Sequence, residues 1–255
     1  MTSSTYAKNF LAIDVGNTSI HFALCRGGRF VRHFRIATKD GSKSAIAAIQ
    51  KNRAMAPAVI ASVVPAVGEL LKKNIKRKLG LPAYLIGKDI TLTIKNKYKN
   101  PKQVGVDRLL NAMAAYKEHP GELIIVDFGT AITFDVVSKK GEYLGGVIAP
   151  GIEISLDAIF QRPALLPKTK LEHPKDLIGR DTVESIRVGC SVGIGGLCDR
   201  VIEEISTRYR MKPYVIATGG YAEFISRYCR YIRKIDPDLI MKGIGLAFCR
   251  SVRKY

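Results

Sequence analysis

The sequence contains no tryptophan, and it has only five cysteines and four histidines. The cysteines are odd in number and never spaced C-x-x-C, so they indicate neither a disulfide framework nor a zinc site. The histidines form no cluster of the kind that binds a metal ion. We therefore expect reduced, mostly buried thiols and histidines with structural roles.

Long apolar runs are also missing. The first nine residues lack the apolar core of a signal peptide, and the apolar run behind them is broken at Asp14. The most apolar window elsewhere, 54–68, is interrupted by Pro57 and Pro65 and is shorter than the ~20 residues that span a bilayer. The sequence predicts a soluble, cytoplasmic protein that does not associate with a membrane.

Acidic residues are few compared with basic ones, at 22 Asp and Glu against 41 Lys and Arg, which gives a net charge of +19. Such an excess favours anionic partners, among them nucleotides, nucleic acids and membrane surfaces. The basic residues are spread along the chain, and no arginine-glycine tract or aromatic RNA-binding motif accompanies them. A solvated basic face is therefore favoured over nucleic-acid binding.

What the chain does contain is an alternation of strand and helix patterns. Its 255 residues suffice for one large or two modest domains. Helical spacing at 42–53 and 69–79 alternates with apolar strand patterns at 58–64 and 84–86, whereas 91–103 is basic and turn-rich. This alternation predicts an α/β fold.

One pattern occurs twice: an apolar strand, an Asp-x-Gly-(Asn)-Thr turn and a second strand. The copies are centred on Asp14 and Asp127. A single copy is most simply an ordinary strand-turn-strand with the acid in the turn. Two copies predict a duplicated fold, with two halves that face each other across a cleft able to take the phosphates of a nucleotide.

The stretch 105–135 contains several residues that could take part in catalysis or ligand binding. Helical spacing behind Gly105 places Asp107 in the first turn of a helix, which holds its carboxylate in a fixed position. Asp127 ends the following buried strand, where it can hold a metal ion or orient a water molecule. Gly129 lets a phosphate approach the backbone, and the Thr130 hydroxyl can donate to a phosphate oxygen.

The C-terminal part contains three further features. The proline-bearing run 161–180 has the length of a lid, a binding loop or a disordered segment. Asp181 and Glu184 resemble an N-cap and its partner, and the helix behind them bears four glycines that cost ~1 kcal/mol each, which predicts a compensating close contact such as a subunit interface. Strand 214–217 ends in Thr218-Gly219-Gly220, where bare backbone can accept an adenine or ribose before a predicted helix at 221–232.

Taken in order, these motifs resemble those of the type III pantothenate kinases, a family of the acetate kinase, sugar kinase, heat-shock ATPase and actin superfamily. The resemblance extends over nearly the whole chain. It rests on the segments LAIDVGNTSI (11–20), SVVP (62–65), Tyr98 with NP and GVDR (100–108), DFGTAITFD (127–135), GGVIAPG (145–151), GRDT (179–182) and TGGYA (218–222).

The resemblance implies a ribonuclease H-like, actin-like ATPase fold with two similar α/β halves of mixed sheets, at 1–117 and 118–255, around a nucleotide cleft. It implies ATP-dependent phosphorylation of pantothenate to 4'-phosphopantothenate, the first step of coenzyme A biosynthesis, by a homodimer with a shared active site. ATP with Mg²⁺ and a monovalent cation, K⁺ or NH₄⁺, are the implied cofactors.

The same resemblance assigns roles to residues. Asp107 is implied as the general base, Asp127 as the ligand of the monovalent cation and Asp14 as the residue near Mg²⁺. The implied ATP-binding residues are Asp14, Val15, Gly16, Asn17, Thr18, Ser19, Ile20, Thr130, Gly219 and Gly220. The implied pantothenate-binding residues are Tyr98, Gly105, Val106, Asp107, Arg108 and Thr182, with Thr182 reaching the substrate from the partner subunit.

Two other functions remain open on the sequence. One is a regulatory relative that keeps the fold and activates transcription through a partner. The other is a different small-molecule kinase or phosphatase of the same superfamily, for which G-V-D-R would be an accident. An ATPase assay with and without pantothenate separates the three.

Overall fold

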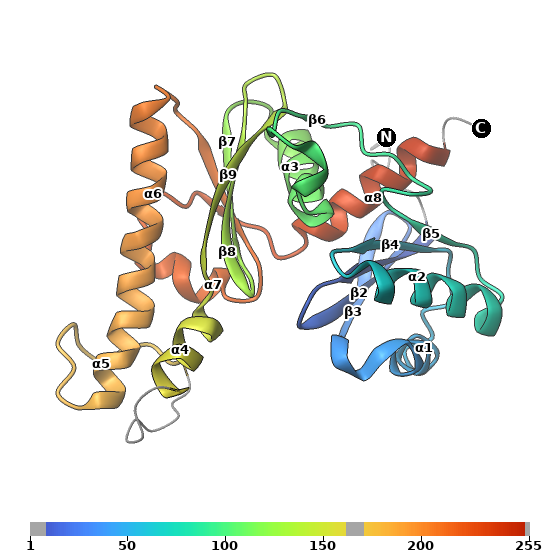
Figure 1. Cartoon of the computed structure of the whole chain (residues 1–255), viewed down its shortest axis with the longest axis horizontal. Helices are drawn as coiled ribbons and strands as arrows, with labels where there is room; N and C mark the ends of the chain where they lie inside the picture. The colour runs from blue at the N-terminus through green and yellow to red at the C-terminus, as the bar shows by residue number, and fades with distance from the viewer. Residues whose placement is uncertain (1–8, 162–170, 253–255) are drawn as a thin grey trace. The chain divides into compact units, whose positions relative to one another are not determined.

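The computed structural model describes residues 9–161 and 171–252, and they divide into two compact units (Figure 1). The first unit comprises the described residues up to Glu118 and those from Asp238 onward, and the second comprises those from His119 to Pro237. The first division lies one residue from the boundary predicted between 117 and 118. The return of the chain at Asp238 was not part of that prediction, which placed this segment in the C-terminal half.

The first unit contains a sheet and four α-helices. The strands of this sheet are β1 (Asn9–Val15), β2 (Ser19–Arg26), β3 (Arg29–Ala37), β4 (Ala58–Ser62) and β5 (Ala83–Leu85), and the short β6 (Lys95–Asn96) is not part of it. The helices are α1 (Gly41–Lys51), α2 (Pro65–Asn74), α3 (Val106–Glu118) and α8 (Leu239–Val252). Short 3-10 and π turns lie at Thr38–Asp40, Pro101–Gln103 and Ile75–Leu79.

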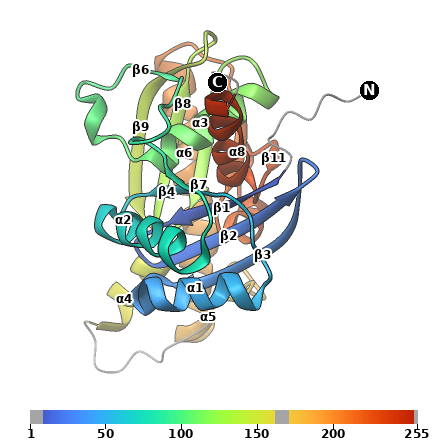
Figure 2. The same ribbon diagram turned by 90° about the vertical axis from the view of Figure 1, so that its right-hand side faces the viewer.

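Both faces of this sheet are covered, because the central strands are apolar on both sides. Leu11 and Ile13 of β1 point toward α1 and α2, whereas Phe10 and Ala12 point toward α3 and α8. Figure 2 shows α1 and α2 on one side of the strands and α8 on the other. Unbroken apolar runs of this kind are typical of strands buried on both faces.

The second unit repeats the design. Its strands are β7 (Leu123–Phe128), β8 (Ala131–Val137), β9 (Glu142–Pro150), β10 (Tyr214–Thr218) and β11 (Lys234–Ile235). Its helices are α4 (Ile152–Gln161), α5 (Thr182–Val188), α6 (Ile194–Arg208) and α7 (Ala222–Ile225), with a π turn at Gly189–Gly193 and a 3-10 turn at Ser226–Tyr228. Helices α6 and α7 pack on one face of the sheet through Ile194, Cys198, Ile202 and Ile225.

The strand orders confirm the predicted duplication. The first sheet runs β3-β2-β1-β4-β5, and the second contains β9-β8-β7-β10-β11 as neighbours. In each, the first strand pairs antiparallel with its hairpin partner and parallel with the fourth strand. Asp14 and Asp127 occupy the same place, one residue before the end of that first strand.

One predicted helix is wrong in its C-terminal part. The spacing at 221–232 predicted a continuous helix, but α7 ends at Ile225 and its 3-10 continuation ends at Tyr228. Cys229 is extended, and the Arg230 amide donates to Asp199 of α6 at 2.8 Å. The chain then enters β11, so strand pairing and a side-chain acceptor replace the helical bonds.

No helix among the described residues combines the length and the apolarity needed to cross a membrane.

Candidate active site

Asp14 stands where β1 opens into the first loop. It pairs with His21 on β2 and with Ala61 on β4. The Gly16 amide closes the loop by donating to the Ser19 carbonyl at 3.0 Å, and a Cβ on Gly16 would come within 3.2 Å of that oxygen. A glycine here keeps the loop narrow, so its backbone can approach a phosphate.

Thr38 fixes the first loop from the far end of β3, a role that no sequence motif marked. Its hydroxyl donates to the Gly16 carbonyl at 2.8 Å, and its amide donates to the Thr18 carbonyl at 2.9 Å. Both bonds satisfy loop carbonyls, so the loop is ordered before any ligand arrives.

The segment Ser62 to Pro65 joins this loop to the segment that carries Asp107. The Val63 amide donates to the Val15 carbonyl at 3.1 Å, and a Cβ on Gly105 would lie 3.6 Å from the Val63 side chain. Ser62 stiffens the turn, because its hydroxyl donates to the Val64 carbonyl at 2.8 Å. The structure thus brings two predicted site segments together within the first unit.

Asp107 lies in the first turn of α3, as predicted, and its carboxylate lies directly over Gly105. A side chain at Gly105 would collide with Asp107 Oδ1, which explains the glycine. The Arg108 amide donates to Asp107 Oδ1 at 2.9 Å. Burial raises the pKa of the Asp107 carboxyl, while the Arg108 amide and charge act against that rise. A carboxylate with a raised pKa is a stronger base than an exposed one.

His21, next to Asp14 in the sheet, is neutral. Burial first, and then Arg35 and His33, lower the pKa of His21 to about 3. Since Arg35 can only donate, its contact with His21 Nδ1 at 3.5 Å assigns the ring proton to Nε2, which faces His33 at 3.3 Å. The structural role expected for this histidine is consistent with that tautomer.

In the second unit, three predicted motifs converge around Asp127. Gly219 has φ of +93°, and a Cβ there would collide with Asp127 Oδ1 and come within 2.7 Å of the Phe128 carbonyl oxygen. Gly151 lies against the Thr130 carbonyl, and its Cβ would come within 2.7 Å of the Gly129 oxygen. The D-F-G-T, A-P-G and T-G-G segments therefore meet through bare backbone, and this close packing requires the two glycines.

Tyr221 and Glu153 hold two of these segments together; Glu153 was not selected from the sequence, and Tyr221 was included only as part of the TGGYA segment. The Tyr221 hydroxyl donates to Glu153 Oε1 at 2.6 Å, and the Tyr221 amide donates to the Phe128 carbonyl at 3.3 Å. Burial, followed by the bond to Glu153, raises the pKa of Tyr221 to about 12. The phenol therefore remains a donor at any physiological pH.

Asp14 and Asp127 suit a metal ion that is held mainly by the phosphates of a bound nucleotide. Among the described residues, no three His, Cys, Asp or Glu side chains gather into a metal-binding group. Asp14 and Asp127 belong to different units. Because Mg²⁺ in kinases is commonly held by one or two carboxylates together with substrate phosphates, isolated aspartates beside phosphate loops suit it.

Thr182 and Tyr98 lie elsewhere in their units. Thr182 begins α5 and, with Ile186, Gly189 and Gly193, lines an open groove of about 520 Å³. Tyr98 is half-buried behind β6, and its amide donates to Asn96 Oδ1 at 2.9 Å. Their predicted roles in substrate binding stay predictions.

Comparison with known proteins gives a consistent result. A family profile described as type III pantothenate kinase matches residues 10–204. A type III pantothenate kinase from Pelobacter propionicus is 38% identical over 251 residues, which cover 94% of this chain and 99% of that protein. One from Moorella thermoacetica is 38% identical over 252 residues, with the same coverage of each chain.

Solved structures agree on the fold. A Campylobacter jejuni protein described as a putative Baf family transcriptional activator superposes with a TM-score of 0.59 at 20% identity and covers 96% of this chain and 98% of that one. A ROK family glucokinase from Streptomyces griseus gives 0.51 at 13% identity, with 94% and 99% covered. At such identities the likeness shows the fold, and it confirms the expected actin-like α/β architecture.

Proposed function

Since this chain belongs to the type III pantothenate kinase family, we propose that it transfers the γ-phosphoryl group of ATP to the hydroxyl of pantothenate and so begins coenzyme A synthesis. The observation that carries the proposal is the Asp107 carboxylate, held over Gly105 in the matching G-V-D-R segment at the start of α3. The matched segments and the near-complete coverage of the relatives support it.

In the proposed reaction, Asp107 accepts the proton of the attacking hydroxyl. Phosphoryl transfer has a loose transition state, so positioning and charge neutralisation supply most of the rate. The proton leaves late, and a carboxylate therefore suffices as the acceptor. Burial of Asp107 raises the pKa of its carboxyl toward neutral pH, which makes the carboxylate a better proton acceptor.

The nucleotide is assigned to the glycine-bearing loops. We place the ATP phosphates at Asp14 to Ile20 and Thr130, with Mg²⁺ near Asp14, and the adenosine at Gly219 and Gly220. Asp127 would hold a monovalent cation that neutralises phosphate charge. Gly16 and Gly219 support this assignment because each keeps bare backbone in an aspartate-bearing loop, where a Cβ at Gly16 would crowd the Ser19 carbonyl and one at Gly219 would collide with Asp127.

We also propose a homodimer whose contact face is the groove along Thr182, Gly189 and Gly193. Among the described residues, a Cβ on Gly189 or Gly193 would meet no heavy atom within 4 Å. Packing within this part of the chain therefore explains neither glycine, whereas it explains Gly195, because a Cβ there would collide with the Tyr228 backbone. Leu197, 38% exposed, adds an apolar side chain to the same groove.

The direct test measures ADP release by a coupled assay, with and without pantothenate. We expect release that depends on pantothenate and a phosphorylated product of matching mass. A panel of other small alcohols serves as the control for specificity. Release that is equally fast without pantothenate, or faster with another alcohol, would contradict the assignment.

A further inference from the structure

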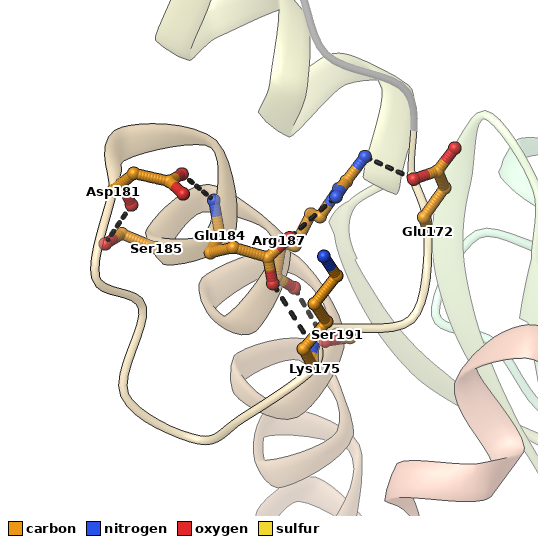
Figure 3. A network of polar contacts seen from close by, with 7 residues as sticks. All are labelled: Glu172, Lys175, Asp181, Glu184, Ser185, Arg187 and Ser191. Atoms are coloured by element: carbon orange, nitrogen blue, oxygen red, sulfur yellow. Dashed lines mark hydrogen bonds and ion pairs between the residues drawn. The ribbon is translucent and has the colours of Figure 1, made fainter.

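The loop from Leu171 to Asp181, which leads into Thr182, is tied to α5 at several points (Figure 3). Asp181 Oδ1 accepts from the Glu184 amide at 2.9 Å, and the Ser185 hydroxyl donates to the Asp181 carbonyl at 2.8 Å. Gly179 packs on α5 so closely that a Cβ there would come within 2.6 Å of Ser185 Cα. The end of the loop is thus anchored by the helix it precedes.

Arg187 extends these ties to the beginning of the loop. One guanidinium nitrogen donates to Glu184 on the same helix at 2.7 Å, and the other bonds to Glu172 at the start of the loop. The second oxygen of Glu184 accepts from the Lys175 amide at 3.2 Å. A single arginine therefore connects the beginning of the loop to α5, directly through Glu172 and through Glu184 to the Lys175 amide, as Figure 3 shows.

Two features of this network do not contribute to the stability of the fold. Arg187 Nε is buried, and among the described residues it has no hydrogen-bond partner. The loop that it holds exposes two apolar side chains, Leu177 at 66% and Ile178 at 75%. A buried donor without a partner destabilises the fold, and the two exposed apolar side chains gain no stabilisation from burial in an isolated chain. The network instead fixes the position of a surface element.

We propose that Arg187 is a positioning residue: through Glu172 and Glu184 it holds the 171–181 loop and the start of α5 so that Thr182 is presented to the pantothenate site. The inference rests on the proposed function for its substrate. Arginine suits the task because its planar fork presents donors on separate nitrogens to the two carboxylates in a fixed geometry, whereas a lysine ammonium is a single point charge on a flexible stem.

Ionic strength, rather than pH, is the condition to vary. The hydrogen bond from Arg187 lowers the pKa of Glu184. The stabilisation from this ion pair is therefore fully present above the ordinary pKa of a glutamate, and it is lost only when the pH falls through the lowered pKa of Glu184. It is therefore constant at neutral pH. Salt screens the Glu172 contact most, because that carboxylate is 59% exposed.

The experiment compares Arg187→Gln with Arg187→Lys and with Arg200→Gln. Arg200 is the matched control, since it also pairs with two glutamates, Glu203 and Glu204, but on the surface of α6. We expect Arg187→Gln to raise the KM for pantothenate by ~10-fold, with kcat and the KM for ATP within ~2-fold of wild type. Arg187→Lys should fall between, and Arg200→Gln should match wild type.

A double-mutant cycle separates positioning from general stabilisation. If Arg187 acts through Thr182, adding Arg187→Gln to Thr182→Ala should change the KM no further, so the two effects are not additive. Raised salt should increase the pantothenate KM of the wild type but not that of Arg187→Gln. Additive effects, or a KM unchanged in Arg187→Gln, would overturn the proposal.

Trypsin provides a readout that needs no substrate. Lys175 and Arg180 are exposed cleavage sites within the loop. We expect Arg187→Gln to be cut there at least several-fold faster than wild type and Arg200→Gln, with fragments identified by mass. Equal cleavage rates in folded proteins would overturn the positioning role. An inactive wild type whose loop is still protected by Arg187 would overturn only the proposed function.

Discussion

At the scale of single residues, Asp107 is expected to work against stability. Burial raises its pKa in the folded state above the ~3.9 of an unfolded aspartate. Below that value the carboxyl is protonated in both states and costs nothing. As the pH rises through the folded-state pKa, the buried carboxylate ionises, and its contribution to stability becomes unfavourable.

Asp107→Asn should therefore lower turnover without lowering stability. We expect kcat to fall by ~10²–10⁴, as for loss of a general base, while ATP binding persists and the melting temperature at pH 7 is equal or higher. In the wild type, the acid limb of the kcat/KM profile should lie above the usual aspartate range. Turnover that is unchanged in the variant would remove Asp107 from the role of base.

Asp127 gives a second prediction at this scale. If its carboxylate holds a monovalent ion beside ATP, replacing potassium by sodium should abolish most activity, because sodium is smaller and keeps its hydration shell more tightly. Choline at the same ionic strength is the control, and Asp127→Asn should no longer distinguish the two salts. Equal wild-type rates in potassium and sodium would contradict this assignment.

At the scale of elements, the helix that carries Asp107 depends on α8. Gly243 of α8 lies against the Leu110 backbone of α3, where a Cβ would come within 2.9 Å of Leu110 Cβ and closer to the carbonyl. The two helices thus touch through a glycine, although α8 follows the whole second unit in sequence.

Gly243→Ala should destabilise the protein by ~1–3 kcal/mol, because overpacking against backbone exceeds the ~1 kcal/mol gained in helix propensity. The midpoint of urea unfolding measures the effect. Gly196→Ala on α6 is the control and should stabilise, since a Cβ there meets no atom of the described part of the chain within 4 Å. A higher midpoint for Gly243→Ala would mean that α3 and α8 separate easily.

The elements also show how far the sequence predicts this structure. Local patterns suffice for the hairpins at Asp14 and Asp127, the helix start at Asp107 and the Asp181 cap, whose bond to the Glu184 amide is confirmed. The Glu184 side chain does not complete a capping box. It bonds to Lys175 and Arg187 instead, and nothing in an S/T/D-x-x-E pattern foretells that competition.

Contacts between distant residues account for what the sequence did not predict. Thr38 and Gly16 are 22 residues apart, and Tyr221 and Glu153 are 68 apart. Each bond depends on the twist and register of a sheet, so no short motif encodes it. The same holds for the end of α7, where pairing of β11 with β10 overrides helical spacing at 221–232.

At the scale of the whole molecule, the groove along Thr182, Gly189 and Gly193 motivates a dimer, for which C2 pairing is the commonest solution. If Thr182 serves the partner subunit's Asp107, neither subunit has a complete site alone. At a low pantothenate concentration, Thr182→Ala and Asp107→Asn should then each be nearly inactive as pure proteins, Thr182→Ala through a raised KM and Asp107→Asn through a lowered kcat.

Refolding the two variants together should restore activity, because each mixed dimer contains one site with both wild-type residues. Random pairing makes half of the dimers mixed, and one of their two sites is intact, so we expect about a quarter of wild-type activity.

Sedimentation must show a dimer, and refolding each variant alone is the control. A monomer, or a mixture no more active than its parents, would return Thr182 to its own subunit. A mixture that recovers activity while a folded Gly193→Leu does not dimerise would place the shared site at this groove, since a Cβ at Gly193 meets no atom of the described residues within 4 Å.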